Sequence, residues 1–252
     1  MLTEKEIVMK RLIFAASFVL PALFAFARIV VKDLRARAGL CCALALLTAS
    51  AWAQTPSPQQ PLPSLSPLSP LDARLRKVMA DPKATAAAIV AAKKVTFFCE
   101  VCHGLEGNSV KGDVPNLGGQ NPSYLLTQID MFSRGLRHYQ FMEGLMKLLT
   151  EDDRINATVF YASKTIKPAG NETSEAGRVL YAARCAACHG AQARGNENTP
   201  RLAGQQSEYL RLSITRYRDH SGERIFEPMT AMTASLRNTD IAALTAYLSS
   251  LQ

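Results

Sequence analysis

The apolar and polar positions along the chain predict an all-helical protein. Helix-forming runs rich in Ala and Leu cover residues 84–98, 152–164, 175–184 and 240–251. No stretch shows the strict alternation of apolar and polar residues that is typical of a half-buried strand. Thr150, followed three residues later by Asp153, predicts a capping box at the start of one of these helices. Loops that contain Gly and Pro connect the helical runs.

One pattern of landmarks occurs twice between residues 86 and 252. The first copy consists of Cys99, His103, Pro115, Gln120, Tyr124, Met142, Leu149 and Tyr161. The second consists of Cys185, His189, Pro200, Gln205, Tyr209, Met229, Leu236 and Tyr247. The Pro and the first Tyr are nine residues apart in both copies, and the Met and the Leu are seven apart. A repeat of about 80 residues indicates a duplicated domain, so we expect domains at 71–168 and 169–252, separated by the turn-rich segment 168–173.

The motif Cys-x-x-Cys-His opens each copy, at residues 99–103 and again at 185–189. Residues at i, i+3 and i+4 share one face of a helical turn, so two thiols can bond to the vinyl groups of one porphyrin. The adjacent imidazole then reaches the iron. This spacing is the attachment signal of c-type haem, and it predicts two covalently bound haem c groups. The predicted haem-binding residues are Cys99, Cys102, His103, Cys185, Cys188 and His189.

Other uses of paired cysteines fit the spacing less well. The two knuckles of a zinc site usually lie about 15–20 residues apart, whereas Cys102 and Cys185 are 83 positions apart. A thioredoxin-like redox pair needs a βαβ context, and the residues around both motifs look helical. Neither alternative explains a His after both second cysteines.

Each haem iron needs a second axial ligand, and a Met thioether is the expected one because it favours the reduced iron. Two methionines compete in each copy: Met142 and Met146 in the first, Met229 and Met232 in the second. Ligation by a second His is the rival hypothesis. His138 and His220 lie at unmatched positions, four and nine residues before Met142 and Met229. A repeated ligand should repeat its spacing, so we expect both to be solvated loop residues.

The first fifth of the chain carries targeting signals. The apolar run at residues 40–49 follows basic residues and ends in Ala51-Trp52-Ala53, which predicts a secretory signal peptide cleaved after Ala53. The leader region would be 1–53, and the Pro- and Ser-rich segment 54–70 would be an extended linker. An earlier apolar run at residues 12–27 could serve as an alternative leader or as a membrane anchor. We expect a periplasmic protein, with membrane association through this run as the alternative.

The net charge of +8 falls once the predicted leader is set aside. The remaining chain holds 22 basic and 18 acidic residues, and haem propionates would offset most of the excess. The basic residues are scattered and not interleaved with aromatic ones, which excludes a nucleic-acid-binding surface. Cys41 and Cys42 fall within the leader, so the two motifs use every cysteine of the expected mature chain.

The ordered landmarks of both copies resemble the dihaem cytochromes of the cytochrome c4 type over residues 86–252. The resemblance implies an all-α fold of two tandem cytochrome c-like domains, each wrapped around one covalent haem. It implies Met142 and Met229 as iron ligands, with Met146 and Met232 as core or haem-packing residues. It also implies that the carbonyl groups of Pro115 and Pro200 contact His103 and His189. Two further candidates, for contacts to haem propionates, are Arg137 and Arg224.

The expected function is that of a soluble periplasmic carrier of single electrons and not of an enzyme. The resemblance implies donors of the cytochrome bc1 kind and terminal oxidases as acceptors. Two alternatives stay open. The chain could be the dedicated dihaem electron-accepting subunit of a dehydrogenase or flavoprotein, or a dihaem peroxidase, which would need one iron with an accessible position.

Overall fold

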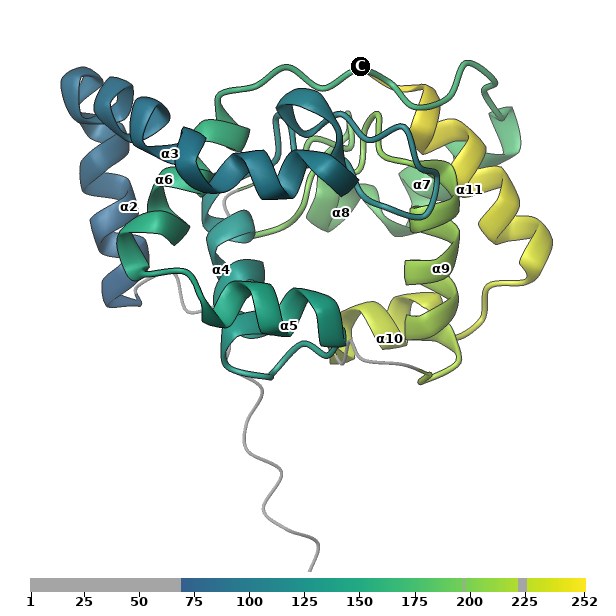
Figure 1. Cartoon of the computed structure of the whole chain (residues 1–252). Helices are drawn as coiled ribbons and strands as arrows, with labels where there is room; N and C mark the ends of the chain where they lie inside the picture. The colour runs from purple at the N-terminus through teal and green to yellow at the C-terminus, as the bar shows by residue number, and fades with distance from the viewer. Residues whose placement is uncertain (1–68, 197, 222–225) are drawn as a thin grey trace, which may run out of the picture. The chain divides into compact units, whose positions relative to one another are not determined.

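The computed structural model describes residues 69–196, 198–221 and 226–252, and within these ranges the regular secondary structure is entirely helical (Figure 1). The predicted all-α fold class is therefore confirmed. The predicted leader, the cleavage after Ala53 and nearly all of the linker 54–70 lie outside the described residues. The helices are α2 (Pro70–Ala80), α3 (Pro82–His103), η1 (Leu105–Gly107), α4 (Pro122–Ser133), α5 (Gln140–Lys147), α6 (Glu151–Ala162), α7 (Glu175–Arg184), α8 (Ala186–His189), α9 (Ser207–Arg218), α10 (Glu227–Thr233) and α11 (Asn238–Ser250).

In the first copy, helix α3 crosses the closing helix α6. Small side chains allow the close approach, since Ala88 and Ala92 of α3 are both buried. Helix α6 begins with the predicted capping box: the Asp153 amide donates to the Thr150 hydroxyl, and the Thr150 amide donates to the Asp153 carboxylate, both at 3.2 Å. The hydroxyl of Tyr161 on α6 lies 3.5 Å from the carbonyl oxygen of Thr96 on α3.

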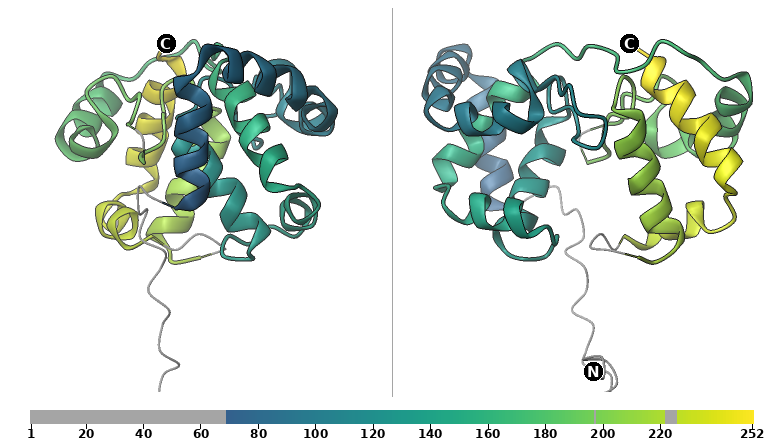
Figure 2. Two further views of the ribbon diagram at one scale, coloured as in Figure 1. Left: turned by 90° about the vertical axis from the view of Figure 1, so that its left-hand side faces the viewer. Right: turned by 45° about the vertical axis from the view of Figure 1, so that its right-hand side comes forward.

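The second copy repeats this crossing with α7 and α11. Gly177 lies where the two helices touch, and the rings of Tyr181 and Tyr247 lie 5.7 Å apart beside it. Helix α9 packs on the other side of α11, and Figure 2 shows this arrangement from a second direction. The buried core of this copy includes Tyr181, Leu210 and Leu244 and is built from residues of the second copy alone.

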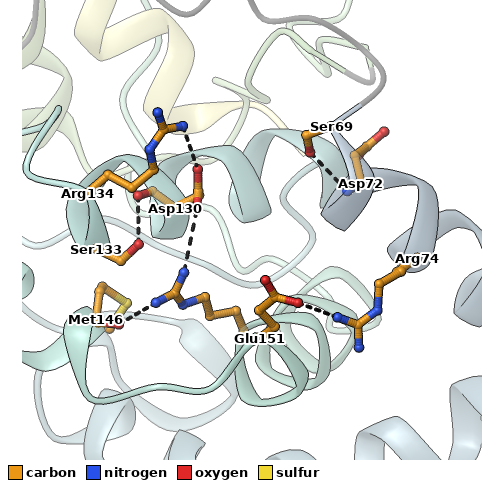
Figure 3. A network of polar contacts seen from close by, with 9 residues as sticks. Ser69, Asp72, Arg74, Asp130, Ser133, Arg134, Met146 and Glu151 are labelled. Carbon is orange, nitrogen blue, oxygen red and sulfur yellow. Dashed lines mark hydrogen bonds and ion pairs between the residues drawn. The ribbon is translucent and has the colours of Figure 1, made fainter.

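Helix α2 is an element that the sequence analysis did not predict. It begins at Pro70, the last residue of the expected linker, and Ser69 caps it by accepting a hydrogen bond from the Asp72 amide. Leu75 is buried in a cluster with residues of α3, α4 and α6. Figure 3 shows the polar contact that joins α2 to the start of α6, from Arg74 to Glu151. The second copy has no equivalent among its described residues.

One arginine of α6 makes polar contacts with both α4 and α5. The guanidinium of Arg154 lies 3.5 Å from a carboxylate oxygen of Asp130 on α4 and donates to the carbonyl oxygen of Met146 on α5 at 3.4 Å. Met146 itself is buried. These contacts fix the segment that carries the predicted distal methionine of the first copy.

No helix within the described part of the chain is long and apolar enough to cross a membrane.

Candidate haem sites

The first candidate site lies at the end of helix α3. His103 is the last residue of the helix, and Gly104 ends it with a positive φ of 74°. The Nδ1 atom of His103 lies 2.8 Å from the carbonyl oxygen of Pro115. A carbonyl only accepts hydrogen bonds, so Nδ1 carries the hydrogen and Nε2 keeps a free lone pair. This is the state in which an imidazole binds a metal through Nε2.

The second site repeats the arrangement with one difference in the backbone. Helix α7 ends before the motif, and the short helix α8 carries His189 as its last residue, followed by Gly190 with φ of 76°. The Nδ1 atom of His189 lies 3.1 Å from the carbonyl oxygen of Pro200. Thus both proline contacts implied by the resemblance are present as hydrogen bonds.

Burial favours the uncharged form of both imidazoles. It is the main cause that lowers the pKa of His103 and of His189, and the hydrogen bond to the proline carbonyl opposes it. A neutral imidazole is the form that can bind iron, whereas an imidazolium cannot.

None of the four described cysteines is in a disulfide. Cys99, Cys102 and Cys185 are partly buried, and Cys188 is exposed. Burial is the main cause that raises the pKa of Cys99 and Cys185. None of the four is used in a disulfide, so all remain available for thioether bonds to a porphyrin.

The two candidate distal methionines lie on matching short helices. Met142 is in α5 and Met229 is in α10, and both are partly buried. In Figure 1 these helices lie along the lower edge of the molecule, away from α3 and α8, which carry the histidines. Their competitors differ: Met146 is 3% exposed and belongs to the core, whereas Met232 is 45% exposed.

Comparison with known proteins agrees with this geometry. The family model described as Cytochrome c matches residues 174–252. Cytochrome c4 of Azotobacter vinelandii is 29% identical over 178 residues, which cover 61% of this chain and 84% of that protein. Cytochrome c-554(547) of Halothiobacillus neapolitanus is 35% identical over 86 residues, covering 31% of this chain and 94% of that protein.

A solved structure extends the likeness to both copies. Reduced recombinant cytochrome c4 from Pseudomonas stutzeri matches with a TM-score of 0.60 and 25% identity, over 67% of this chain and 98% of that one. This chain belongs to the cytochrome c4-type family of dihaem c-type cytochromes. It is a c-type electron carrier of two cytochrome c domains with two covalently bound haem c groups. A further relative, the thiosulfate dehydrogenase electron acceptor of Stutzerimonas stutzeri, is 26% identical over 172 residues, 61% of this chain and 78% of that protein.

The residues present in this cytochrome c4-type chain fit the two haem groups. Each copy places two free thiols three residues apart, a His with an available Nε2 atom one residue further on, and a Met on a separate helix. Within residues 69–196, 198–221 and 226–252, no three side chains of His, Cys, Asp or Glu are grouped so that they could hold a metal ion by themselves.

The rival histidine ligands and the two arginines expected at the haem propionates were the remaining candidates from the sequence. His138 and His220 are both exposed residues outside the helices, and His138 is 3.4 Å from a carboxylate oxygen of Glu143. Arg137 stacks its guanidinium 4.4 Å from the ring centre of Phe132 and donates to the Gln128 side chain at 2.7 Å. Arg224 lies outside the described residues.

Sequence reasoning missed the contacts that join the two copies. It used Gln120 and Gln205 only as landmarks of the repeat. In the structure both side chains are buried, and each is hydrogen-bonded to the backbone of the other copy. The only signal for them was their matched position five residues after Pro115 and Pro200.

Proposed function

We propose that this chain is a periplasmic carrier that passes single electrons between respiratory redox proteins. Each haem, once attached, would supply an iron that changes its charge by one. The residues of the chain hold this group, keep water from it and fix its ligands. The proposed partners are a donor of the cytochrome bc1 kind and a terminal oxidase as acceptor.

In the proposed first site, Cys99 and Cys102 form the thioether bonds, and His103 and Met142 bind the iron. In the second site, Cys185 and Cys188 form these bonds, and His189 and Met229 bind the iron. Pro115 and Pro200 orient the two imidazoles through the hydrogen bonds described above. An iron held by both a His and a Met of the chain would have no place for a substrate, which favours electron transfer over peroxidase chemistry.

The observation that carries the proposal is the repeated hydrogen bond between a proline carbonyl and the histidine that follows each Cys-x-x-Cys. The contact joins residues 12 positions apart in the first copy and 11 in the second. In both it leaves Nε2 as the metal-binding atom of a buried, neutral imidazole. The predicted domains 71–168 and 169–252 would each contain one such site.

Export to the periplasm is supported by the predicted leader 1–53. The proposal is tested by mass spectrometry of the exported protein. The mass should exceed that of the bare chain by two haem groups, and a bare chain mass would overturn the proposal.

The distal ligands are tested by the weak near-red band that oxidised iron shows with a sulfur ligand. We expect about half of this band to be lost in Met142→Ala and in Met229→Ala, because each variant removes one thioether. Met232→Ala, on the same helix as Met229, is the matched control and should keep the whole band, as should Met146→Leu, which conserves core volume. An undiminished band in Met142→Ala or Met229→Ala would refute that assignment.

A second candidate function is that of a dedicated electron acceptor for a dehydrogenase. It is favoured by the likeness to the thiosulfate dehydrogenase electron acceptor of Stutzerimonas stutzeri. The two candidates differ in assembly, because a dedicated subunit should elute with its enzyme in gel filtration of native extracts, whereas a shuttling carrier elutes alone. Addition of thiosulfate to such an extract should reduce the haems only if a thiosulfate-oxidising enzyme uses this chain.

A further inference from the structure

The two copies of the sequence are joined by a reciprocal pair of glutamine contacts. The side chain of Gln205, in the second copy, accepts a hydrogen bond from the amide of Asn116 at 2.7 Å and donates to the carbonyl oxygen of Asn116 at 3.0 Å. The side chain of Gln120, in the first copy, binds Arg201 in the same way, at 2.7 and 2.9 Å. Both glutamines are almost fully buried, with exposed fractions of 4% and 7%.

Each of these amides belongs to the peptide group that also holds a haem histidine. The carbonyl of Pro115 and the N–H of Asn116 are the two ends of one peptide. The carbonyl accepts from Nδ1 of His103, and the N–H donates to Gln205. In the other copy, the peptide of Pro200 and Arg201 joins His189 to Gln120 in the same way. One peptide group therefore separates each haem histidine from a glutamine of the opposite copy.

Hydrogen bonds in such a chain polarise one another. A donor bond at the peptide N–H places more negative charge on the carbonyl oxygen, which then accepts more strongly from the imidazole, by roughly 10–30%. A stronger bond at Nδ1 makes the imidazole a stronger donor of electron density through Nε2. That donation stabilises the oxidised iron and lowers its midpoint potential.

We propose that Gln205 lowers the midpoint potential of the haem at His103, and that Gln120 lowers that of the haem at His189. The two glutamines are positioning residues that act across the contact between the copies. The inference rests on the proposed ligation of iron by His103 and His189. If it holds, the midpoint potential of each haem depends on a glutamine of the opposite copy.

The experiment uses the exported holoprotein of Gln205→Met and Gln120→Met, in which a side chain of similar length can neither accept nor donate. Weakening the bond should favour reduction of one haem by roughly two- to threefold, which corresponds to a rise of about 18–28 mV at 59 mV per tenfold change. Gln205→Met should raise the potential of the haem at His103 alone, and Gln120→Met that of the haem at His189 alone. The wave displaced in Met142→Ala identifies the haem at His103.

Two neighbouring residues provide matched controls. Gln206 donates from its side chain to the carbonyl oxygen of Ser109 at 2.7 Å, and Asn121 donates to the carbonyl oxygens of Arg194 and Thr199 at 3.1 and 2.7 Å. Both residues join the two copies without a side-chain bond to the peptide groups that hold the histidines, although Gln206 also donates to the side chain of Asn116 at 3.2 Å, which makes Asn121→Ala the stricter control. If the polarised peptide sets the potential, and not the tightness of the contact between the copies, Gln206→Ala and Asn121→Ala should leave both potentials unchanged.

A second variant keeps the proposal testable if the Met variants do not accumulate. Gln205→Glu retains an acceptor oxygen for the amide of Asn116, and this oxygen is anionic and accepts more strongly, whereas the bond that Gln205 donates to the carbonyl oxygen of Asn116 is lost. The potential of the haem at His103 should then fall, and by more than that of the haem at His189. Equal shifts of both haems, or a shift confined to the haem of the variant's own copy, would overturn the inference.

The experiments distinguish failure of the proposed function from failure of the proposed role of Gln205 and Gln120. A mass without haem would refute the haem sites themselves. Two haems with intact near-red bands and potentials that do not respond to Gln205 or Gln120 would refute only the crossed dependence. Nuclear magnetic resonance of the reduced protein adds an independent reading, because loss of its hydrogen bond should move the amide proton of Asn116 upfield in Gln205→Met.

Discussion

Gly177→Ala would add one methyl group at a point where two helices leave no room for it. Gly177 lies where α7 crosses α11. A Cβ atom at this position would overlap the carbonyl oxygen of Ala243 and lie 2.9 Å from the Cβ atom of Tyr247. The Ala243 oxygen is a backbone atom within a helix, so it cannot turn aside as a side chain could. The two helices would have to move apart.

Two opposing contributions set the change in the free energy of unfolding. Overpacking of a filled contact costs typically about 1–3 kcal/mol, and the overlap with backbone places this case at the upper end. Replacing Gly by Ala within a helix returns roughly 0.5–1 kcal/mol. The expected net loss in the free energy of unfolding is about 2 kcal/mol. For the compact unit Gln60–Gln252, which holds both copies, that corresponds to a fall in Tm of roughly 4–8 °C.

The assay is urea unfolding of the holoprotein, followed by far-ultraviolet circular dichroism and by haem absorbance. The matched control is Gly144→Ala on helix α5, because a Cβ atom there would meet nothing within 4 Å. That variant should be unchanged or more stable by up to about 1 kcal/mol. If Gly177→Ala unfolds within about 0.5 kcal/mol of the parent, the close crossing of α7 and α11 is refuted.

Three further predictions concern the first copy and the haems. Thr150→Ala removes the hydroxyl half of the capping box of α6 and should cost about 1 kcal/mol in urea unfolding, whereas Thr127→Ala, outside any cap, should cost less. The pKa of Asp153 is lowered, first by its hydrogen bond with Lys94 and then by Thr150. Its ionised form therefore stabilises the fold above the ordinary carboxyl pKa, and this contribution is lost as the pH falls through the lowered pKa. Asp153→Asn should be less stable than the parent at pH 7, and the difference should shrink below about pH 4; a constant difference would contradict this. Finally, the haem attachment segments differ, with Phe98 in the first copy where the second has Arg184, so redox titration should resolve two potentials, and superimposable waves would contradict it.

The sequence predicted best those elements whose signals are local. The bounds expected for 175–184 coincide with α7, and the capping box of α6 is present as predicted. Helix α2 was missed because its stability comes from distant residues. It follows a Pro- and Ser-rich segment, and it is held by the burial of Leu75 and by the ion pairs of Arg74 with the start of α6. A short helix stabilised by tertiary contacts carries little periodic signal of its own.

In the candidate haem sites, too, the sequence revealed the residues with a local spacing signal but not the contacts between distant residues. The spacing of the two thiols and the His could be understood from one helical turn, so Cys99, Cys102 and His103 were found from the residues alone. The hydrogen bond from His103 to Pro115 was expected only through a family resemblance, because it spans a loop of 12 residues. The contact of Gln205 with Asn116 joins residues 89 positions apart, and no local pattern indicates it.

The duplication explains why the contact between the copies takes this form. When equivalent surfaces of two copies meet, each contact occurs twice with the roles exchanged, as in a twofold dimer. Gln205 binds Asn116 while Gln120 binds Arg201, although Asn and Arg have little chemistry in common. The bonds use only the backbone N–H and carbonyl of these two residues, so their side chains are free to differ. The proline before each of them and the glutamine four residues after it are the parts that the contact needs, and the two copies agree at both of these positions.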